Sequence, residues 1–454
     1  MKRFIYTSML ALVFNAALCQ TFERLFPGSA YQMSLVEAYD STLMVVYHPP
    51  DSQTVTAFMN LNYSGDSLQS VFYPNVYTSI DNIIRSIDGN YLTTGDYTGN
   101  DLFISKLNVN FDTIWTRKFQ GFIPFFHPKI IELFDSSLMV VYVRYNGAFY
   151  GISKVLHADK NGNIIWVLDQ GETHVWQDPN IVAKDSLAYT AINMGVLSKD
   201  SMLQLSCINA NNGNFEWQRQ FVEFSGNPNL PIRNIASSIA LKDSFIYVAG
   251  TSIDTSNMKH QMLMKFDLIG NLIWKRTFSD GSFSKLIIAN PNKIVCIGLA
   301  SDTITLSSYN KDGQEIWIHN FRNAILNYVN NLIEVSDSGF AFVCESRDSL
   351  VKMYVVKTDS SGSLISTTSI NQPGQSEDFI NYHYTKNELT TYLSSNSIGK
   401  INLMLFDLQG RLIISRELSF GSNSIDISGL RINPYIVLYY CKNKLLKRFK
   451  FVNN

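Results

Sequence analysis

The sequence predicts an all-β protein built from a repeated unit of short strands, and three observations indicate this. A turn glycine followed four residues later by tryptophan recurs about every fifty residues. Apolar, strand-like runs such as residues 243–250 and 292–298 precede these turns. No helical pattern separates the copies. Such a repeat predicts a β-propeller of seven blades, in which radial closure protects the sheet edges, and its periodicity also allows an eighth.

The turn glycines mark the copies, which are centred on Gly65, a degenerate turn at Phe111, Gly162, Gly213, Gly270, Gly313 and Gly362. The repeated tryptophans are Trp115, Trp166, Trp217, Trp274 and Trp317, with Gln69 and Ser366 in the outermost copies. Dipeptides such as Asn161-Gly162 accept positive φ, so each copy should contain a tight hairpin. Because the tryptophans recur at one position, we expect them to pack between blades. Stacking on a carbohydrate is the alternative.

The N-terminal segment has the features of a signal peptide. Met1-Lys2-Arg3 precedes an apolar run over residues 4–18, and Ala17-Leu18-Cys19 offers small residues at a cleavage site. We therefore expect residues 1–19 to be removed before Gln20. A lipid anchor on Cys19 is the alternative. No later segment has the apolar length of a spanning helix, so the mature protein is expected not to be integral to the membrane.

The charge balance argues against nucleic-acid binding, and the positions of the cysteines argue against a set of disulfides. Lys plus Arg total 37 and Asp plus Glu total 38, so no overall field favours nucleic acid, and no nucleic-acid partner is expected. Beyond the signal peptide, the cysteines lie in apolar runs without paired spacing, and we expect buried free thiols. They are Cys207, Cys296, Cys344 and Cys441.

The sequence after the seventh copy predicts a second module. Residues 20–372 are assigned to the propeller, the polar stretch 373–378 to a linker and residues 379–454 to a C-terminal β module that resembles a small sandwich. Gly410 could instead be the turn of an eighth blade. The absence of tryptophan and the two further strands after Arg411 favour the separate module.

Two resemblances to known families follow from these motifs. The Gly-x-x-x-Trp repeat, over about residues 24–372, resembles the tryptophan-docking repeat of quinoprotein-type propellers and of exported bacterial propellers. The chain lacks the adjacent cysteine pair of quinone enzymes, so no cofactor is implied. The tail, with Asp407-Leu-Gln-Gly-Arg411 and Ile425-Asp-Ile-Ser-Gly-Leu430, resembles the C-terminal sorting domain of the type IX secretion system of Bacteroidetes.

The second resemblance implies a partner and a location. The partner is the type IX secretion machinery, and the protein would be secreted or held at the outer cell surface after periplasmic transit. The residues that carry the sorting resemblance are Gly410, Arg411, Gly429, Leu430, Tyr435, Lys444, Lys447 and Arg448. The chain departs from the family pattern at Tyr382-His383-Tyr384, in place of Pro-Asn-Pro, and at Pro434, in place of glycine.

The sequence predicts no catalytic residue and no metal site, since its seven histidines never occur at HxH or HExxH spacing. Candidate ligand contacts lie in two connections between copies, at His127, His174, Trp176 and Asp178. The leading hypothesis is a non-catalytic exported binding module for a glycan, peptide or surface partner. The alternatives are an extracellular hydrolase or lyase with a site on the axial face, and a structural component of the cell-surface machinery.

Overall fold

The computed structural model describes residues 20–27, 29–49, 55–74, 77–97, 101–122, 128–145, 150–174, 179–194, 202–224, 231–289, 293–301, 303–323, 329–347, 351–364, 380–384, 388–393, 400–407, 411–419, 421–430, 434–441 and 444–452. Within these ranges every regular element is a β-strand, so the all-β prediction is confirmed. The chain divides into two compact units, residues 1–365 and 366–454. The expected signal peptide and linker lie outside the described residues.

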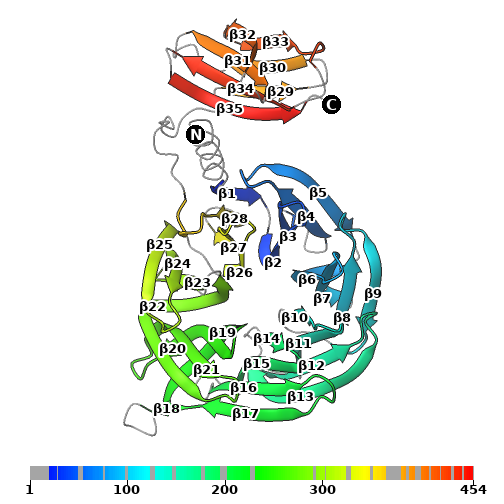
Figure 1. Cartoon of the computed structure of the whole chain (residues 1–454), viewed down its shortest axis with the longest axis vertical. Coiled ribbons are helices and arrows are strands. Elements are labelled where there is room, and N and C mark those ends of the chain that lie inside the picture. The colour runs from blue at the N-terminus through cyan, green and yellow to red at the C-terminus, as the bar shows by residue number, and fades with distance from the viewer. Residues whose placement is uncertain are drawn as a thin grey trace, which may run out of the picture. The chain divides into compact units, whose positions relative to one another are not determined.

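The described strands of the first unit form seven four-stranded antiparallel blades set around a central axis (Figure 1). Blade 1 contains β2 (Ser29–Glu37), β3 (Leu43–His48), β4 (Val55–Leu61) and β5 (Ser67–Pro74). Blade 2 contains β6 (Tyr77–Arg85), β7 (Tyr91–Tyr97), β8 (Asp101–Leu107) and β9 (Thr113–Phe119). Blade 3 contains β10 (Lys129–Glu132), β11 (Leu138–Tyr145), β12 (Tyr150–Ala158) and β13 (Ile164–His174).

Blades 4 to 6 continue this order. Blade 4 contains β14 (Asn180–Lys184), β15 (Leu187–Met194), β16 (Met202–Asn209) and β17 (Phe215–Phe221). The short β18 (Glu223–Phe224) pairs with β19 (Pro231–Lys242), which opens blade 5 before β20 (Phe245–Ile253) and β21 (Lys259–Asp267). The long β22 (Leu272–Ala289) ends blade 5 and begins blade 6, which is completed by β23 (Lys293–Ala300), β24 (Thr303–Tyr309) and β25 (Glu315–Asn323).

Blade 7 joins the two ends of the first unit. It contains β26 (Val329–Glu334), β27 (Phe340–Arg347), β28 (Val351–Lys357) and, as its outer strand, β1 (Phe22–Pro27) from the start of the described chain. Figure 1 shows β1 beside β28, and their antiparallel register runs from the pair Phe22 and Lys357 to the pair Pro27 and Lys352. The N-terminal strand therefore closes the circle of blades.

A separate hydrophobic core lies between each pair of neighbouring blades. Between blades 2 and 3, for instance, Leu102 of β8 shares a core with Val140 of β11, and between blades 7 and 1 Val343 shares one with Val45. The second and third strands of the blades are largely buried, as in β3, whose residues are all buried, which explains why they read as continuous apolar runs rather than alternating ones. Outer strands such as β17 alternate between exposed and partly buried residues.

The repeated tryptophans lie on the outer strands and contact the turn glycine of the next blade. A Cβ added to Gly213 would lie 2.9 Å from the ring of Trp166, and the same contact joins four more pairs: Trp115 and Gly162, Trp217 and Gly270, Trp274 and Gly313, and Trp317 and Gly362. These glycines also have positive φ, for example 78° at Gly162. Glycine is therefore required for two reasons: its backbone has positive φ, and the indole ring leaves no room for a side chain.

Two interfaces depart from this pattern. At the closure, Phe22 of β1 takes the tryptophan's place, and a Cβ on Gly65 would lie 2.7 Å from its ring. Between blades 1 and 2 both partners differ. Gln69 stands at the tryptophan position, paired with Asn60 as Trp115 is with Lys106, and the turn residue is Phe111, with φ 67°. The Phe111 ring is buried and stacks on Tyr91 at 4.7 Å.

The second unit contains two sheets with one shared core. The first sheet is β29 (Ile380–Tyr384), β30 (Glu388–Leu393) and β33 (Gly421–Asp426). The second, in spatial order, is β32 (Leu412–Leu418), β31 (Ile401–Asp407), β34 (Pro434–Cys441) and β35 (Lys444–Val452). Leu389 and Ile425 of the first sheet pack with Leu403 and Val437 of the second. Strands β31 and β32, which flank position 410, thus belong to this unit and not to an eighth blade.

Two further expectations can be compared with the structure. The four cysteines described are free and buried, as expected, and burial raises the pKa of Cys296 and Cys344. Among the described residues, no helix is long and apolar enough to cross a membrane.

Candidate functional site

The turns between the first and second strands of blades 1, 2, 3 and 7 share one backbone design. They span residues 38–42, 86–90, 133–137 and 335–339. In each, the first residue donates its N–H to the carbonyl of the fifth, and the fourth has positive φ, as at Ser136 (65°). The third residue is aspartate, whose carboxylate accepts the N–H two residues later, 3.0 Å from Ser137 N to Asp135 Oδ1. These contacts fix the turn and leave the side chain of its second residue exposed to solvent.

In blades 2, 3 and 7 a side chain from the third strand of the same blade also holds the turn. Lys106 forms an ion pair with Asp88 in blade 2. In blade 3, His157 Nε2 lies 2.9 Å from Ser137 Oγ. Partial burial opposes ionisation of Asp88, but the Lys106 ion pair and hydrogen bonds from Ser86 and Asn90 outweigh it and lower the pKa of Asp88 to about 2. The carboxylate is therefore charged at neutral pH.

The next blade supplies a second brace through a glutamate at the end of its inner strand. Glu132 of blade 3 accepts the Ile87 N–H at 2.7 Å and the Ser86 hydroxyl at 3.0 Å. Glu37 of blade 1 accepts the Ser336 N–H at 2.7 Å. The turns of blades 2 and 7 are thus held by the blade that follows each of them.

Blade 2 has Arg85 where blades 1 and 3 have glutamate, and the contacts change accordingly. The Arg85 guanidinium pairs with Glu37 at 3.2 Å and lies 4.9 Å from the centre of the Tyr39 ring. The Tyr39 hydroxyl donates to the Ser86 carbonyl at 2.9 Å. The turns of blades 1 and 2 are therefore joined directly by side chains.

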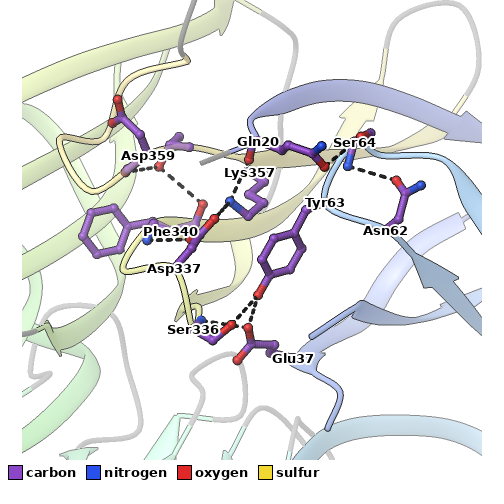
Figure 2. Close-up of polar contacts among 12 residues, drawn as sticks. Gln20, Glu37, Asn62, Tyr63, Ser64, Ser336, Asp337, Phe340, Lys357 and Asp359 are labelled. Atoms are coloured by element: carbon purple, nitrogen blue, oxygen red, sulfur yellow. Dashed lines mark hydrogen bonds and ion pairs between the residues drawn. The ribbon is translucent and has the colours of Figure 1, made fainter. Parts of the chain in front are cut away.

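Figure 2 shows the polar cluster where blade 7 meets blade 1. The fully buried Lys357 pairs with Asp337 at 2.5 Å, donates to the Gln20 carbonyl at 2.7 Å and lies 4.4 Å from the centre of the Tyr63 ring. The Tyr63 hydroxyl donates to Glu37, and burial followed by this hydrogen bond raises the pKa of Tyr63 well above its usual value. The cluster satisfies its own buried charges and ties the N-terminal end to the last blade.

The turns so fixed expose three apolar side chains on consecutive blades: Tyr39, Ile87 and Phe134, which we call the apolar row. Their exposed fractions are 45%, 63% and 94%. The carboxylates and cations around them are already engaged in the ion pairs and hydrogen bonds above. The arrangement therefore offers contact area rather than a free nucleophile or base.

A further ionisable group with a shifted pKa, Asp96, lies toward the opposite end of β7 from the 86–90 turn. In blade 2, burial and the neighbouring Asp81 raise the pKa of Asp96 to about 8, which keeps that carboxyl protonated at neutral pH. Within the described ranges no group of three or more His, Cys, Asp or Glu side chains could hold a metal ion.

The residues expected from the sequence to contact a ligand fall elsewhere or outside the described ranges. His174 is the last residue of β13, its backbone paired with Tyr150, at the opposite end of that strand from the Gly162 turn. His127, Trp176 and Asp178 lie outside the described residues. The sequence reasoning missed the apolar row. Its signal was present as an apolar residue followed by aspartate at the same point of three successive copies.

The described residues of the sorting resemblance lie just before β32, in one turn and on two further strands of the second unit. Exposed Arg411 bonds Asp407 through Nε at 2.6 Å. Gly429 lies in a turn closed by the Leu430 N–H to the Ile427 carbonyl at 3.0 Å, and Tyr435 is buried in the core. Lys444, Lys447 and Arg448 lie on β35, an edge strand of the described sheet. Gly410 lies outside the described residues.

Comparison with solved structures agrees with this architecture. An ulvan lyase of polysaccharide lyase family PL25, bound to -[GlcA(1-4)Rha3S]-, has a TM-score of 0.51 at 8% identity, over 74% of this chain and 96% of its own. The first unit is a β-propeller. Drosophila semaphorin 2a has a TM-score of 0.50 at 8% identity, over 95% of this chain and 97% of its own. At such identities the likeness to the propeller is one of fold alone. No protein-family model and no curated protein matches the sequence.

Proposed function

We propose that this protein is an exported, non-catalytic β-propeller that binds a glycan, peptide or surface partner. The observation that carries the proposal is a set of turns, each held by a side chain from its own blade, from the next blade or from both, which keep exposed apolar side chains in place. Preorganised contact surfaces of this kind lose little conformational entropy on binding. The ionisable groups of this surface are engaged in holding the turns, which favours recognition over catalysis.

Two terminal segments of the chain would direct its export to the cell exterior. The signal-peptide pattern of residues 1–19 supports transfer to the periplasm, and the resemblance of residues 379–454 to type IX sorting domains supports passage through that machinery. The independent core of the second unit is consistent with a separable module. The protein would then be released or held at the outer surface.

Two experiments test this function. The purified mature chain is applied to glycan and peptide arrays and assayed for turnover of polysaccharide and peptide substrates. Saturable binding without turnover is expected. Turnover that disappears on substitution of an axial-face residue would replace the proposal with the extracellular hydrolase or lyase, for which the likeness to the ulvan lyase gives only a shared fold.

The export route is tested in a host with a type IX system. The full chain is compared with a Lys444→Ala/Lys447→Ala/Arg448→Ala variant by fractionation of periplasm, cell surface and medium. Retention of the variant in the periplasm is expected. Equal export of both chains, or export in a strain lacking the machinery, would refute the assigned route.

A further inference from the structure

Among the described turns between first and second strands, only those of blades 1 to 3 carry an exposed apolar side chain; the turn of blade 6 lies outside the described residues. The same five-residue turn in blade 7 has Ser336 in place of Tyr39, Ile87 and Phe134. In blades 4 and 5 the corresponding turns are two residues long, at 185–186 and 243–244, and each follows a lysine. The turn design therefore does not require an apolar side chain. Its presence on three neighbouring blades concentrates apolar surface where single exposed residues would be unremarkable.

Each member of the row is followed by an aspartate: Asp40, Asp88 and Asp135. Hydrogen bonds from the Ser137 hydroxyl and N–H lower the pKa of Asp135, so this carboxylate, like that of Asp88, is ionised at neutral pH. The glutamate braces add further negative charge. The cations among these groups, Arg85 and Lys106, are each paired with a carboxylate.

The combination of exposed apolar area and surplus negative charge favours some classes of binding partner over others. A polyanionic polysaccharide would meet like charge, which costs binding energy. A polypeptide segment that carries lysine or arginine beside apolar side chains would satisfy both features, since aromatic and apolar anchors supply affinity while charge complementarity speeds and orients association.

We infer that the apolar row of Tyr39, Ile87 and Phe134, with the aspartates beside it, docks a basic, apolar segment of a partner protein. The inference rests on the proposed function and names the site and the partner class for it. The partner lies across the turns of blades 1 to 3, with its apolar side chains on the row and its cations between the carboxylates.

The test uses the full mature chain and defined probes in a biolayer assay. The probes are a twelve-residue peptide of three Lys-Leu-Lys-Phe repeats, its Glu-Leu-Glu-Phe counterpart, chondroitin sulfate and a neutral β-glucan. The first variant is Ile87→Ser/Phe134→Ser, which copies the serine of blade 7. The control is Ile269→Ser, because Ile269 is 62% exposed in another turn, that of blade 5.

The lysine peptide should bind the parent chain and the control equally, and the double serine variant at least tenfold more weakly. A second variant, Asp40→Asn/Asp135→Asn, keeps the turn hydrogen-bond acceptors and should weaken binding and flatten its salt dependence. Equal binding by parent and serine variant, or absence of peptide binding altogether, would overturn the inference.

The glycan probes distinguish this failure from failure of the proposed function. If chondroitin sulfate or the glucan binds the parent chain and not the serine variant, the partner class is wrong while a binding propeller remains. If array ligands bind the parent and the serine variant alike, the location is wrong and the proposed function stands. Turnover without any saturable partner would overturn both.

Discussion

The interface between blades 2 and 3 and the interface between blades 1 and 2 solve the same packing problem with different residues. In the former, the Trp115 indole covers Gly162, which has no side chain. In the latter, the outer strand has Gln69, and the turn itself supplies the aromatic ring as Phe111. The outer-strand position and the turn position therefore act as a pair. Aromatic volume is needed once at each interface, and its source decides whether the turn must be glycine.

The largest effect is expected where the outer strand supplies the aromatic. Trp217→Ala removes an indole that contacts Gly270 and donates to the Leu268 carbonyl at 3.1 Å. We expect a loss of about 3 kcal/mol in unfolding free energy, the lower end for truncation of a large aromatic because the ring is partly exposed. Urea denaturation followed by circular dichroism measures it.

Ile269→Ala is the control, because that side chain is 62% exposed and its loss should stay within about 0.5 kcal/mol. Similar losses in the two variants would mean that the tryptophan contributes no packing between blades 4 and 5.

The closing strand should respond next. Phe22 is buried and takes the tryptophan position at the contact with Gly65, so Phe22→Ala should cost about 3 kcal/mol. Phe22→Trp restores the residue used elsewhere and should stay within about 1 kcal/mol of the parent. Hydrogen exchange of β28 reports on closure directly, since β1 pairs along its length. If the β28 amides stay equally protected in the alanine variant, the Phe22 ring does not contribute to the pairing of β1 with β28.

Two turn glycines allow the cost of positive φ to be measured apart from the cost of crowding a tryptophan ring. Both have positive φ, 85° at Gly89 and 75° at Gly313. A Cβ on Gly89 would meet no atom within 4 Å, whereas one on Gly313 would lie 2.9 Å from the Trp274 ring. Gly89→Ala should therefore lose about 1 kcal/mol from backbone strain, and Gly313→Ala about 2 kcal/mol, because the indole must also move.

Thermal denaturation of the two alanine variants beside the parent gives the difference. A Gly313 variant no less stable than the Gly89 variant would show that the indole moves away at no cost, and the double requirement for glycine would be wrong.

The smallest expected effect is the coupling between the paired positions of blades 1 and 2. Gln69→Trp and Phe111→Gly should each destabilise, the first by crowding Phe111 and the second by removing a buried ring. The double variant recreates the pair used elsewhere and should recover about 1 kcal/mol relative to the sum of the single changes. A full double-mutant cycle by urea denaturation measures this, and additive losses would contradict the idea of a pair.

Residue patterns were enough to locate the turns but not the surface between them. The spacing of Gly162 and Trp166 identified a hairpin because positive φ and a recurring aromatic are local properties. The ligand contacts expected at His127, His174, Trp176 and Asp178 rested on unusual residue types in connections. The sequence did place Tyr39, Ile87 and Phe134 before aspartate at the same point of three successive copies, but it did not indicate that these side chains would be exposed rather than buried.

The all-β class, the repeat and the position of each turn glycine follow from local sequence, because strand alternation and turn chemistry depend on neighbouring residues. The residue that closes the circle of blades, and the glycine that each tryptophan covers, follow instead from contacts between distant parts of the chain. Phe22 reaches Gly65 because β1 pairs with β28, more than three hundred residues along the chain. Such contacts depend on how sheets are placed around an axis, and local sequence carries no record of that placement.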